Sequence, residues 1–283
     1  MRAMPTTIRA VISDVDGTLV SVDKTLSGRA QAAVAELRAR GIGFTIISSR
    51  PPRGLGMLLA PLRLTTPFAA CNGGIIAAPD LSVIAEHDIP SRIARRAIAQ
   101  MERDDIESWV FAGKHWLVKE DRGPLVERER RTVQFAPKLV EDFTPYLASA
   151  VKIVGASTDH RRVACCEAKL SIALAGAATV ARSQAYYLDI THPLANKGAA
   201  LAVLAELMGV PTSEIAVLGD GRNDLPMFAA AGLSIAMGNA GEEVKAKADL
   251  VTAANDEEGF AQAVEQFVLP RLNAGPTLQG PRP

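Results

Sequence analysis

Two acidic residues directly after a short apolar run limit the folds available to this chain. Segment 10–19 reads AVISDVDGTL. Its first four residues are small or β-branched and uncharged, which predicts a short buried strand. Asp14 and Asp16 follow where that strand must end, and Gly17 lets the backbone turn sharply. The two acids are therefore expected at the carboxyl edge of a sheet, where open α/β sheets bind ligands.

The close spacing of these acids predicts a bound cation. Like charges at Asp14 and Asp16 raise each other's pKa unless a positive charge lies between them. Mg²⁺, a hard cation that binds oxygen ligands, is the simplest candidate. An isolated D-x-D pattern can equally be an Asp-Gly turn beside a solvated acid. The surrounding residues, DVDGTL after an apolar strand, favour the metal site.

Strands and helices alternate in two parts of the chain and predict a parallel sheet covered by helices. Asn72 and the two glycines after it predict a hairpin, and hence an antiparallel edge. The predicted strands of these parts are 10–13, 42–47, 67–71, 75–77, 83–86, 215–218, 233–237 and 250–252. The predicted helices are 27–41, with Ser27 as N-cap, 193–208, 225–231, 242–248 and 258–267.

Between these two parts the regular alternation of strands and helices gives way to a different order of elements. This change predicts an inserted α+β module. Its expected helices are 91–101, capped by Ser91, 125–131, 139–148 and 162–170, and its expected strands are 106–111, 115–118, 151–154, 171–174 and 186–190. The predicted domains are a core of residues 1–87 and 190–272, the inserted α+β module of residues 88–189, and a disordered tail of residues 273–283, which is rich in Gly and Pro.

The charge balance and the cysteine content limit the kinds of partner and the cellular compartment that are expected for this protein. The 31 Lys and Arg balance the 31 Asp and Glu, so nothing favours a nucleic-acid or membrane-surface partner. Cys71, Cys165 and Cys166 are odd in number and lack C-x-x-C spacing, which suits a reducing compartment. The N-terminus lacks an apolar signal core, and no run of about 18 apolar residues occurs. A soluble cytoplasmic protein, monomeric or homodimeric, is expected.

Four motifs carry polar groups of complementary chemistry. They are DVDGTL at 14–19, SSR at 48–50, NKG at 196–198 and GDGRND at 219–224. The set resembles the motifs of the haloacid dehalogenase-like (HAD) superfamily, specifically its Cof-type phosphatases of subfamily IIB, which insert a large cap between the second and third motifs. The segments 72–74 and 248–252 also resemble family landmarks. The resemblance covers nearly the whole chain and is weak over about 88–189. It implies a doubly wound α/β core, with residues 88–189 as an inserted α+β cap that determines substrate specificity.

The resemblance also implies a role for each motif residue. Asp14 would be the nucleophile that forms an aspartyl-phosphate, and Asp16 would protonate the leaving alcohol and then activate water. Asp16 must therefore hold a proton part of the time. The implied Mg²⁺ ligands are Asp14, the backbone carbonyl of Asp16, and Asp220, with Asp224 supporting the metal site.

Other motif residues would hold the substrate. Ser48 and Lys197 would bind the phosphoryl oxygens, and Asn72 and Asn223 would contact the substrate or support the metal shell. A Ser-Ser pair before prolines is otherwise an ordinary loop. Family members commonly have Thr-Gly-Arg at the second motif. Here Ser49 replaces that glycine, so a narrower site or an altered turn is expected.

Several other residues are interpreted as structural. His87, His115, His160 and His192 are scattered and show no metal-ligand spacing. The Cys165-Cys166 pair falls on a predicted helix and is expected to pack there. Trp109 and Trp116 are expected to pack in the cap sheet rather than to stack on a substrate.

The leading hypothesis is a Mg²⁺-dependent phosphatase, a phosphoric monoester hydrolase acting on a small phosphorylated metabolite such as a sugar phosphate. A phosphomutase on the same fold, which passes the phosphoryl group to a second hydroxyl, remains open. A signalling module that carries an aspartyl-phosphate is the alternative from another class. Such a module needs neither a general acid nor an inserted cap, so Asp16 and residues 88–189 count against it.

Overall fold

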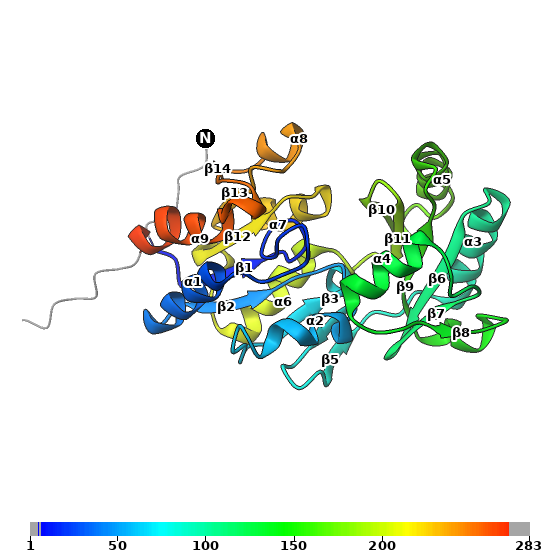
Figure 1. Cartoon of the computed structure of the whole chain (residues 1–283), viewed down its shortest axis with the longest axis horizontal. Helices are drawn as coiled ribbons and strands as arrows, with labels where there is room; N and C mark the ends of the chain where they lie inside the picture. The colour runs from blue at the N-terminus through cyan, green and yellow to red at the C-terminus, as the bar shows by residue number, and fades with distance from the viewer. Residues whose placement is uncertain (1–4, 6, 272–283) are drawn as a thin grey trace, which may run out of the picture.

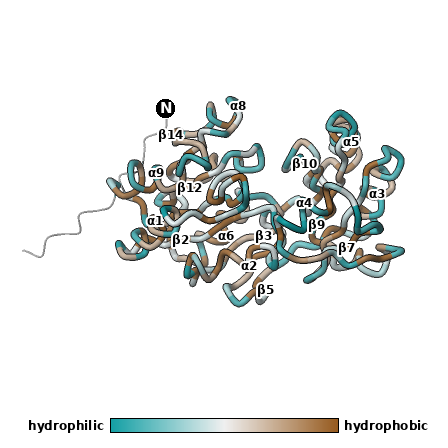
Figure 2. The backbone as a smooth tube through the Cα atoms, viewed as in Figure 1, coloured by the Kyte–Doolittle hydropathy of each residue, from teal (hydrophilic) through white to brown (hydrophobic). Residues whose placement is uncertain are grey.

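The chain forms two lobes, one with a five-stranded and a three-stranded sheet and one with a six-stranded sheet, each lobe with its own helices (Figure 1). The computed structural model describes residues 5 and 7–271. The predicted disordered tail, 273–283, lies outside the described residues. Hydrophobic segments concentrate on the strands inside each lobe, and hydrophilic ones on peripheral turns (Figure 2).

The sheet of the first lobe has five parallel strands in the order β14-β13-β12-β1-β2. They are β1 (Ala10–Ser13), β2 (Gly43–Ile46), β12 (Ile215–Gly219), β13 (Leu233–Ala236) and β14 (Leu250–Val251). β1 pairs with β12 on one side and with β2 on the other. Because parallel strands end at the same edge, the residues after β1, β2 and β12 meet there, although they are far apart in sequence.

A second, antiparallel sheet extends this lobe beyond β2. It contains β3 (Phe68–Ala70), β4 (Ile75–Ala77) and β5 (Val83–Glu86), with β4 paired to both neighbours. A parallel bridge between Ile47 and Ala69 links it to the chain just after β2. The predicted parallel sheet with an antiparallel edge is confirmed.

The helices of this lobe are α1 (Gly28–Ala39), α2 (Pro52–Leu59), α6 (Lys197–Met208), α7 (Leu225–Ala230), α8 (Glu242–Lys245) and α9 (Gly259–Ala263), the last followed by a π-helical turn over Val264–Val268. Ser27 caps α1 as predicted, since its Oγ accepts the Ala30 N–H at 3.0 Å. Sequence analysis missed α2, because its two leading prolines suggested a loop. Pro52 is tolerated as the first helical residue, whose N–H needs no intrahelical partner.

The second lobe holds a six-stranded sheet in the order β10-β11-β9-β6-β7-β8. Its strands are β6 (Glu107–Ala112), β7 (His115–Val118), β8 (Lys138–Leu139), β9 (Ala150–Ala156), β10 (Thr179–Gln184) and β11 (Tyr187–Thr191). Helices α3 (Ser91–Arg103) and α5 (His160–Ala173) share one hydrophobic cluster with this sheet. Helix α4 (Pro124–Val133) lies between the sheet and the first lobe (Figure 1).

The face of the cap sheet toward α4 is aromatic. Trp109 and Trp116 are 0% and 1% exposed, and their ring centroids lie 5.3 Å apart in an edge-to-face arrangement. Val133 of α4 packs against Gly54 of α2, so the same cluster continues into the first lobe. The expectation that both tryptophans pack in the cap sheet is confirmed.

Three local predictions in the cap are wrong. The predicted helix 139–148 is strand β8 followed by a 3₁₀ helix, Thr144–Ser149, because Asp142 accepts the Thr144 N–H and Pro145 offers none. The predicted strand 171–174 belongs largely to α5, whose apolar spacing runs from Val163 to Leu174. Ser91 does not cap α3: its Oγ donates to the Leu147 carbonyl at 3.2 Å, and Pro90 holds the N-cap position. Strand β10 was not predicted.

No helix within residues 5 and 7–271 has the length and apolar content to cross a bilayer.

Candidate active site

Lys197 joins two acidic loops at the carboxyl edge of the parallel sheet. It is the first residue of α6 and is 1% exposed. Its Nζ donates to Asp14 Oδ1 at 2.6 Å and to Asp224 Oδ1 at 2.5 Å. Burial alone would lower the pKa of Lys197, but the two carboxylates raise it overall. The ammonium therefore stays charged between β1 and the loop after β12.

Three carboxylates crowd around this lysine. One carboxylate oxygen each of Asp14, Asp220 and Asp224 lies within 4.8 Å of the others. Burial, followed by the negative charge of Asp224, raises the pKa of Asp220 to about 6. Burial also raises the pKa of Asp14 well above its ordinary value, although Lys197 opposes that shift. Three acids with a single lysine form an oxygen-rich, negatively charged site that fits a divalent cation such as Mg²⁺.

The loop after β1 leaves space for this cluster. Gly17 has φ +82°, and a Cβ at this position would collide with the Asp220 carboxylate. Thr18 Oγ1 donates to Asp220 Oδ1 at 3.1 Å. Asn239 Nδ2 donates to the Gly17 carbonyl at 2.9 Å and lies 3.4 Å from Asp220 Oδ2. Sequence analysis missed Asn239, although its position just after β13 places it at the same sheet edge.

Asp224 shapes the loop that carries Asp220. Its Oδ2 accepts the backbone N–H groups of Asp220 at 2.9 Å and Gly221 at 2.8 Å. Its Oδ1 holds Lys197, so both carboxylate oxygens are engaged. This arrangement suits a residue that orients the cluster.

Asp16 lies in a different electrostatic environment. Its carboxylate accepts two hydrogen bonds from Arg50, each 2.7 Å, and lies 2.7 Å from Lys24 Nζ. Burial would raise the pKa of Asp16, but Arg50 and then Lys24 outweigh burial and lower it to about 2. In this arrangement Asp16 is ionised, whereas its predicted role also needs a protonated form. The contact between Lys24 and Asp16 was not predicted from the sequence.

The second motif lies beside the first. Ser48 is fully buried, and its Oγ accepts the Arg50 N–H at 3.1 Å. The Ile47 N–H donates to the Ser13 carbonyl at 2.9 Å, which brings the ends of the two strands together. Ser49 is not among the described non-glycine residues with positive φ, so serine fits this turn without the left-handed strain that would demand glycine.

Asn72 and Asn223 are brought together at the cap boundary. Asn223 Nδ2 donates to Asn72 Oδ1 at 3.1 Å. The Asn72 N–H donates to the Ser48 carbonyl at 2.8 Å, and its φ of 58° lies in the left-handed region, which Asn tolerates. Both predicted substrate-contacting residues therefore lie on one wall, next to the second motif.

Both residues line a cavity of about 480 Å³ between the lobes, together with Lys197. The first lobe also contributes Asn196, Arg222 and Pro226. The second lobe contributes Glu167, Thr179, Ala181, Arg182, Gln184, Ala185, Asp189 and Thr191. Cap and core residues thus enclose one space beside the acidic cluster.

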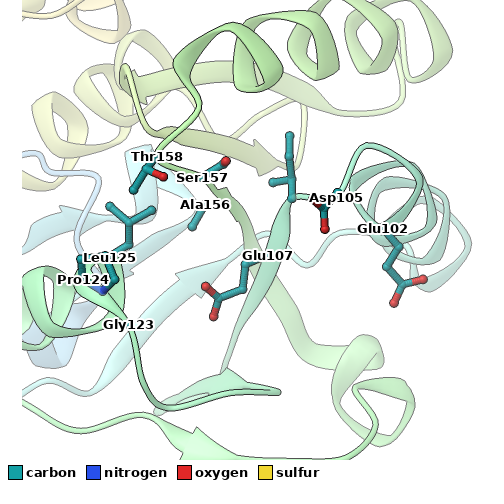
Figure 3. Close-up of a pocket in the computed structure, with 10 residues that line it drawn as sticks. Glu102, Asp105, Glu107, Gly123, Pro124, Leu125, Ala156, Ser157 and Thr158 are labelled. Carbon is teal, nitrogen blue, oxygen red and sulfur yellow. The ribbon is translucent and has the colours of Figure 1, made fainter.

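A second cavity of about 500 Å³ lies entirely in the cap (Figure 3). Its acidic residues include Glu102 and Asp105, which pair with Lys119 and Arg162. None of the residues that line it belongs to the four motifs. The cavity beside Lys197 is therefore the candidate active site.

Two of the histidines that were interpreted as scattered, His87 and His192, lie in contact with each other. The rings of His87 and His192 stack with centroids 5.3 Å apart. His87 follows β5 and His192 follows β11, so the pair bridges the two segments that connect core and cap. Their separation of about a hundred residues hid this contact from sequence analysis.

Comparisons with known proteins agree with this geometry. Residues 11–264 match the haloacid dehalogenase-like hydrolases. A Haemophilus influenzae protein is 30% identical over 261 residues, covering 91% of this chain and 97% of that protein. The 5-amino-6-(5-phospho-D-ribitylamino)uracil phosphatase YwtE of Bacillus subtilis is 27% identical over 286 residues, covering 92% of this chain and 98% of that protein.

Solved structures share the fold. A haloacid dehalogenase-like hydrolase from Bacteroides thetaiotaomicron superposes with a TM-score of 0.81 and 29% sequence identity, over 92% of this chain and 99% of its own. The predicted α/β fold with an inserted cap is thereby confirmed. The matched residues include all four motifs, and the chain belongs to the haloacid dehalogenase-like hydrolase family.

Proposed function

We propose that this protein is a Mg²⁺-dependent phosphatase that hydrolyses a small phosphorylated metabolite through an aspartyl-phosphate. The phosphatase class follows from the family and from relatives such as YwtE. One observation carries the rest of the proposal: Lys197 and three carboxylates meet beside a cavity that cap and core enclose. In this proposal residues 88–189 act as the cap that selects the substrate.

Asp14 is the proposed nucleophile. Its carboxylate oxygen attacks phosphorus, and the bond from phosphorus to the leaving oxygen breaks. Asp14 must be ionised for this attack, and Lys197 favours the ionised form against burial. Asp14, Asp220 and the carbonyl of Asp16 would hold Mg²⁺, with Asp224 in support. The bound ion would offset the negative charge of the carboxylates and the phosphoryl group.

Lys197 and Ser48 are proposed to hold phosphoryl oxygens. An ammonium group has three N–H donors, and Lys197 gives one each to Asp14 and Asp224. The third remains for a phosphoryl oxygen. Ser48 Oγ accepts the Arg50 N–H, so its own hydrogen can be donated.

Asp16 is proposed to move the protons. In the first step it would donate a proton to the leaving oxygen, and in the second it would take one from the attacking water. The water oxygen forms a bond to phosphorus, the bond to Asp14 breaks, and phosphate leaves. The ionised Asp16 seen here suits the second step. Donation in the first step requires weaker contact with Arg50 and Lys24.

Phosphate release separates this proposal from its alternatives. The purified protein is incubated with a panel of phosphorylated metabolites, with Mg²⁺ and with chelator, and free phosphate is measured. We expect release only with Mg²⁺, and none from the Asp14→Asn variant, whose amide is a poor nucleophile. An isomerised phosphate ester without free phosphate would indicate a phosphomutase instead. A persistent phosphoryl-enzyme without turnover would indicate a signalling role.

A further inference from the structure

Asn239 links the loop after β1 to the loop after β12. Its Nδ2 donates to the Gly17 carbonyl at 2.9 Å and to Asp220 Oδ2 at 3.4 Å. Its Oδ1 accepts the Asn255 N–H at 3.0 Å. Both amide hydrogens and the amide oxygen are therefore engaged, although the residue is exposed. Three contacts on one exposed side chain fix its orientation.

The backbone that carries Asn239 is anchored at the same sheet edge. Met237, two residues earlier, donates its N–H to the Gly219 carbonyl at 3.0 Å. Gly238 donates its N–H to the Ala253 carbonyl, also at 3.0 Å. The amide of Asn239 therefore reaches both loops from a fixed position.

The Gly17 carbonyl lies one residue after the Asp16 carbonyl, which is a proposed metal ligand. The peptide unit between Gly17 and Thr18 is held at both of its polar groups. Asn239 donates to its oxygen, and its N–H, from Thr18, donates to the Val15 carbonyl at 3.4 Å. Because adjacent peptide planes meet at the Gly17 Cα, holding this unit restricts the direction of the Asp16 carbonyl.

The Asp220 carboxylate is held by donors at both oxygens. Thr18 Oγ1 donates to Oδ1 at 3.1 Å, and Asn239 donates to Oδ2. Each oxygen keeps a lone pair that a cation can use. An amide suits the position of Asn239, because it donates twice and adds no charge. An ammonium group there would repel Mg²⁺, and a carboxylate would repel Asp220.

We propose that Asn239 is a positioning residue for the metal site: it joins the loop of Asp16 to Asp220, so that ligands from two separate loops keep a fixed arrangement. This inference rests on the Mg²⁺ site of the proposed function and adds a residue outside the four motifs. Groups that orient metal ligands in this way contribute strongly to metal affinity without touching the ion.

The test measures Mg²⁺ binding by calorimetry, without substrate, for the wild type and for Asn239→Leu. Leucine has a similar shape but neither donates nor accepts a hydrogen bond. We expect the Kd for Mg²⁺ to rise about tenfold or more. The half-activating Mg²⁺ concentration for phosphate release should rise in parallel, while kcat at saturating Mg²⁺ stays within about threefold, because the excess metal restores the loaded site.

The matched control is Asn255→Ala. This variant keeps the backbone N–H that Asn239 accepts, and it removes the side-chain donation to the Val20 carbonyl at 2.8 Å. Val20 belongs to the same loop as Asp16 but is not a proposed metal ligand. We therefore expect the Kd for Mg²⁺ to stay within about twofold of the wild type.

The possible results separate this inference from the proposed function. If the wild type binds Mg²⁺ and releases phosphate, and Asn239→Leu has the same Kd, only the inference is overturned. Equal weakening in Asn239→Leu and Asn255→Ala would assign Asn239 to general support of the loop and would also overturn it. A wild type that binds no Mg²⁺ would overturn both proposals.

Folding of the variants is checked by thermal melts in chelator. Asn239→Ala, which removes the same donors and adds no bulk, replaces Asn239→Leu if the latter does not fold. If neither variant folds, the amide supports the fold as a whole and the inference is overturned.

Discussion

Arg50 holds the Asp16 carboxylate with two hydrogen bonds of 2.7 Å. The same guanidinium donates to the Thr132 carbonyl of α4 at 2.8 Å. Arg50 is 2% exposed, so this connection between the first motif and the cap is shielded from solvent. The orientation of Asp16 therefore depends on a cap helix as well as on its own loop.

Replacement of Arg50 by lysine is expected to lower kcat roughly 10- to 100-fold by slowing the second step, because lysine keeps a charge but cannot orient both oxygens of the ionised Asp16 that takes a proton from water. Steady-state phosphate release measures this effect. Lys24→Met serves as the control, since Lys24 is one-third exposed and makes a single contact, and a smaller loss is expected. An unchanged kcat in Arg50→Lys would show that the paired geometry has no role in turnover.

Asp16→Asn should slow both formation and hydrolysis of the aspartyl-phosphate, roughly 100-fold or more, because an amide neither donates nor takes the required proton. Mg²⁺ affinity should change little, since the proposed metal contact at this position is a backbone carbonyl. Rapid quenching gives the two rates, and calorimetry with Mg²⁺ gives the affinity. Strongly weakened Mg²⁺ binding would contradict the carbonyl assignment.

The acidic cluster predicts competition between protons and Mg²⁺. The pKa of Asp220 is raised to about 6, above its ordinary value, so without metal its ionised form is disfavoured in the folded state. Protonation of Asp220 should therefore increase the free energy of unfolding of the metal-free protein as the pH falls through about 6. Mg²⁺ binds the ionised form, so the Mg²⁺-induced rise in Tm should be larger at pH 7.5 than at pH 5.

Melting curves with Mg²⁺ and with chelator test this prediction. The Asp220→Asn variant should lose most of the Mg²⁺-induced rise in Tm at pH 7.5. Equal Mg²⁺-induced shifts at both pH values in the wild type would mean that Asp220 does not take part in metal binding.

The stacked histidines predict a second pH effect. Burial and then the charge of His87 lower the pKa of His192, so the folded state favours its neutral form. A base with a lowered pKa contributes stability above its unfolded pKa of about 6.5, and this contribution is lost as the pH falls. Thermal melts of wild type and His192→Gln, both in chelator, should therefore diverge between pH 7 and 5, with the wild type losing more. Parallel curves would show that folding does not lower the pKa of His192.

Local sequence determined the elements of the core and the motif residues. The apolar run before Asp14 predicts β1, and the runs before Ser48 and Asp220 predict β2 and β12, because buried parallel strands require uninterrupted apolar residues. Parallel pairing then placed their polar ends at one edge. The same local reasoning failed at 139–148 and 171–174, where a proline and a long helical repeat decided the structure.

Only the tertiary structure determined the ionisation states in the site and the residues that the cap contributes to it. Asp16 was identified from its motif, but its ionised state depends on Arg50, 34 positions away. Asp189 meets Asn72 across 117 positions, on a strand whose contacts the sequence does not reveal. Sequence periodicity reports which face of an element is buried, whereas electrostatic partners depend on which elements the folded chain brings within a few ångströms.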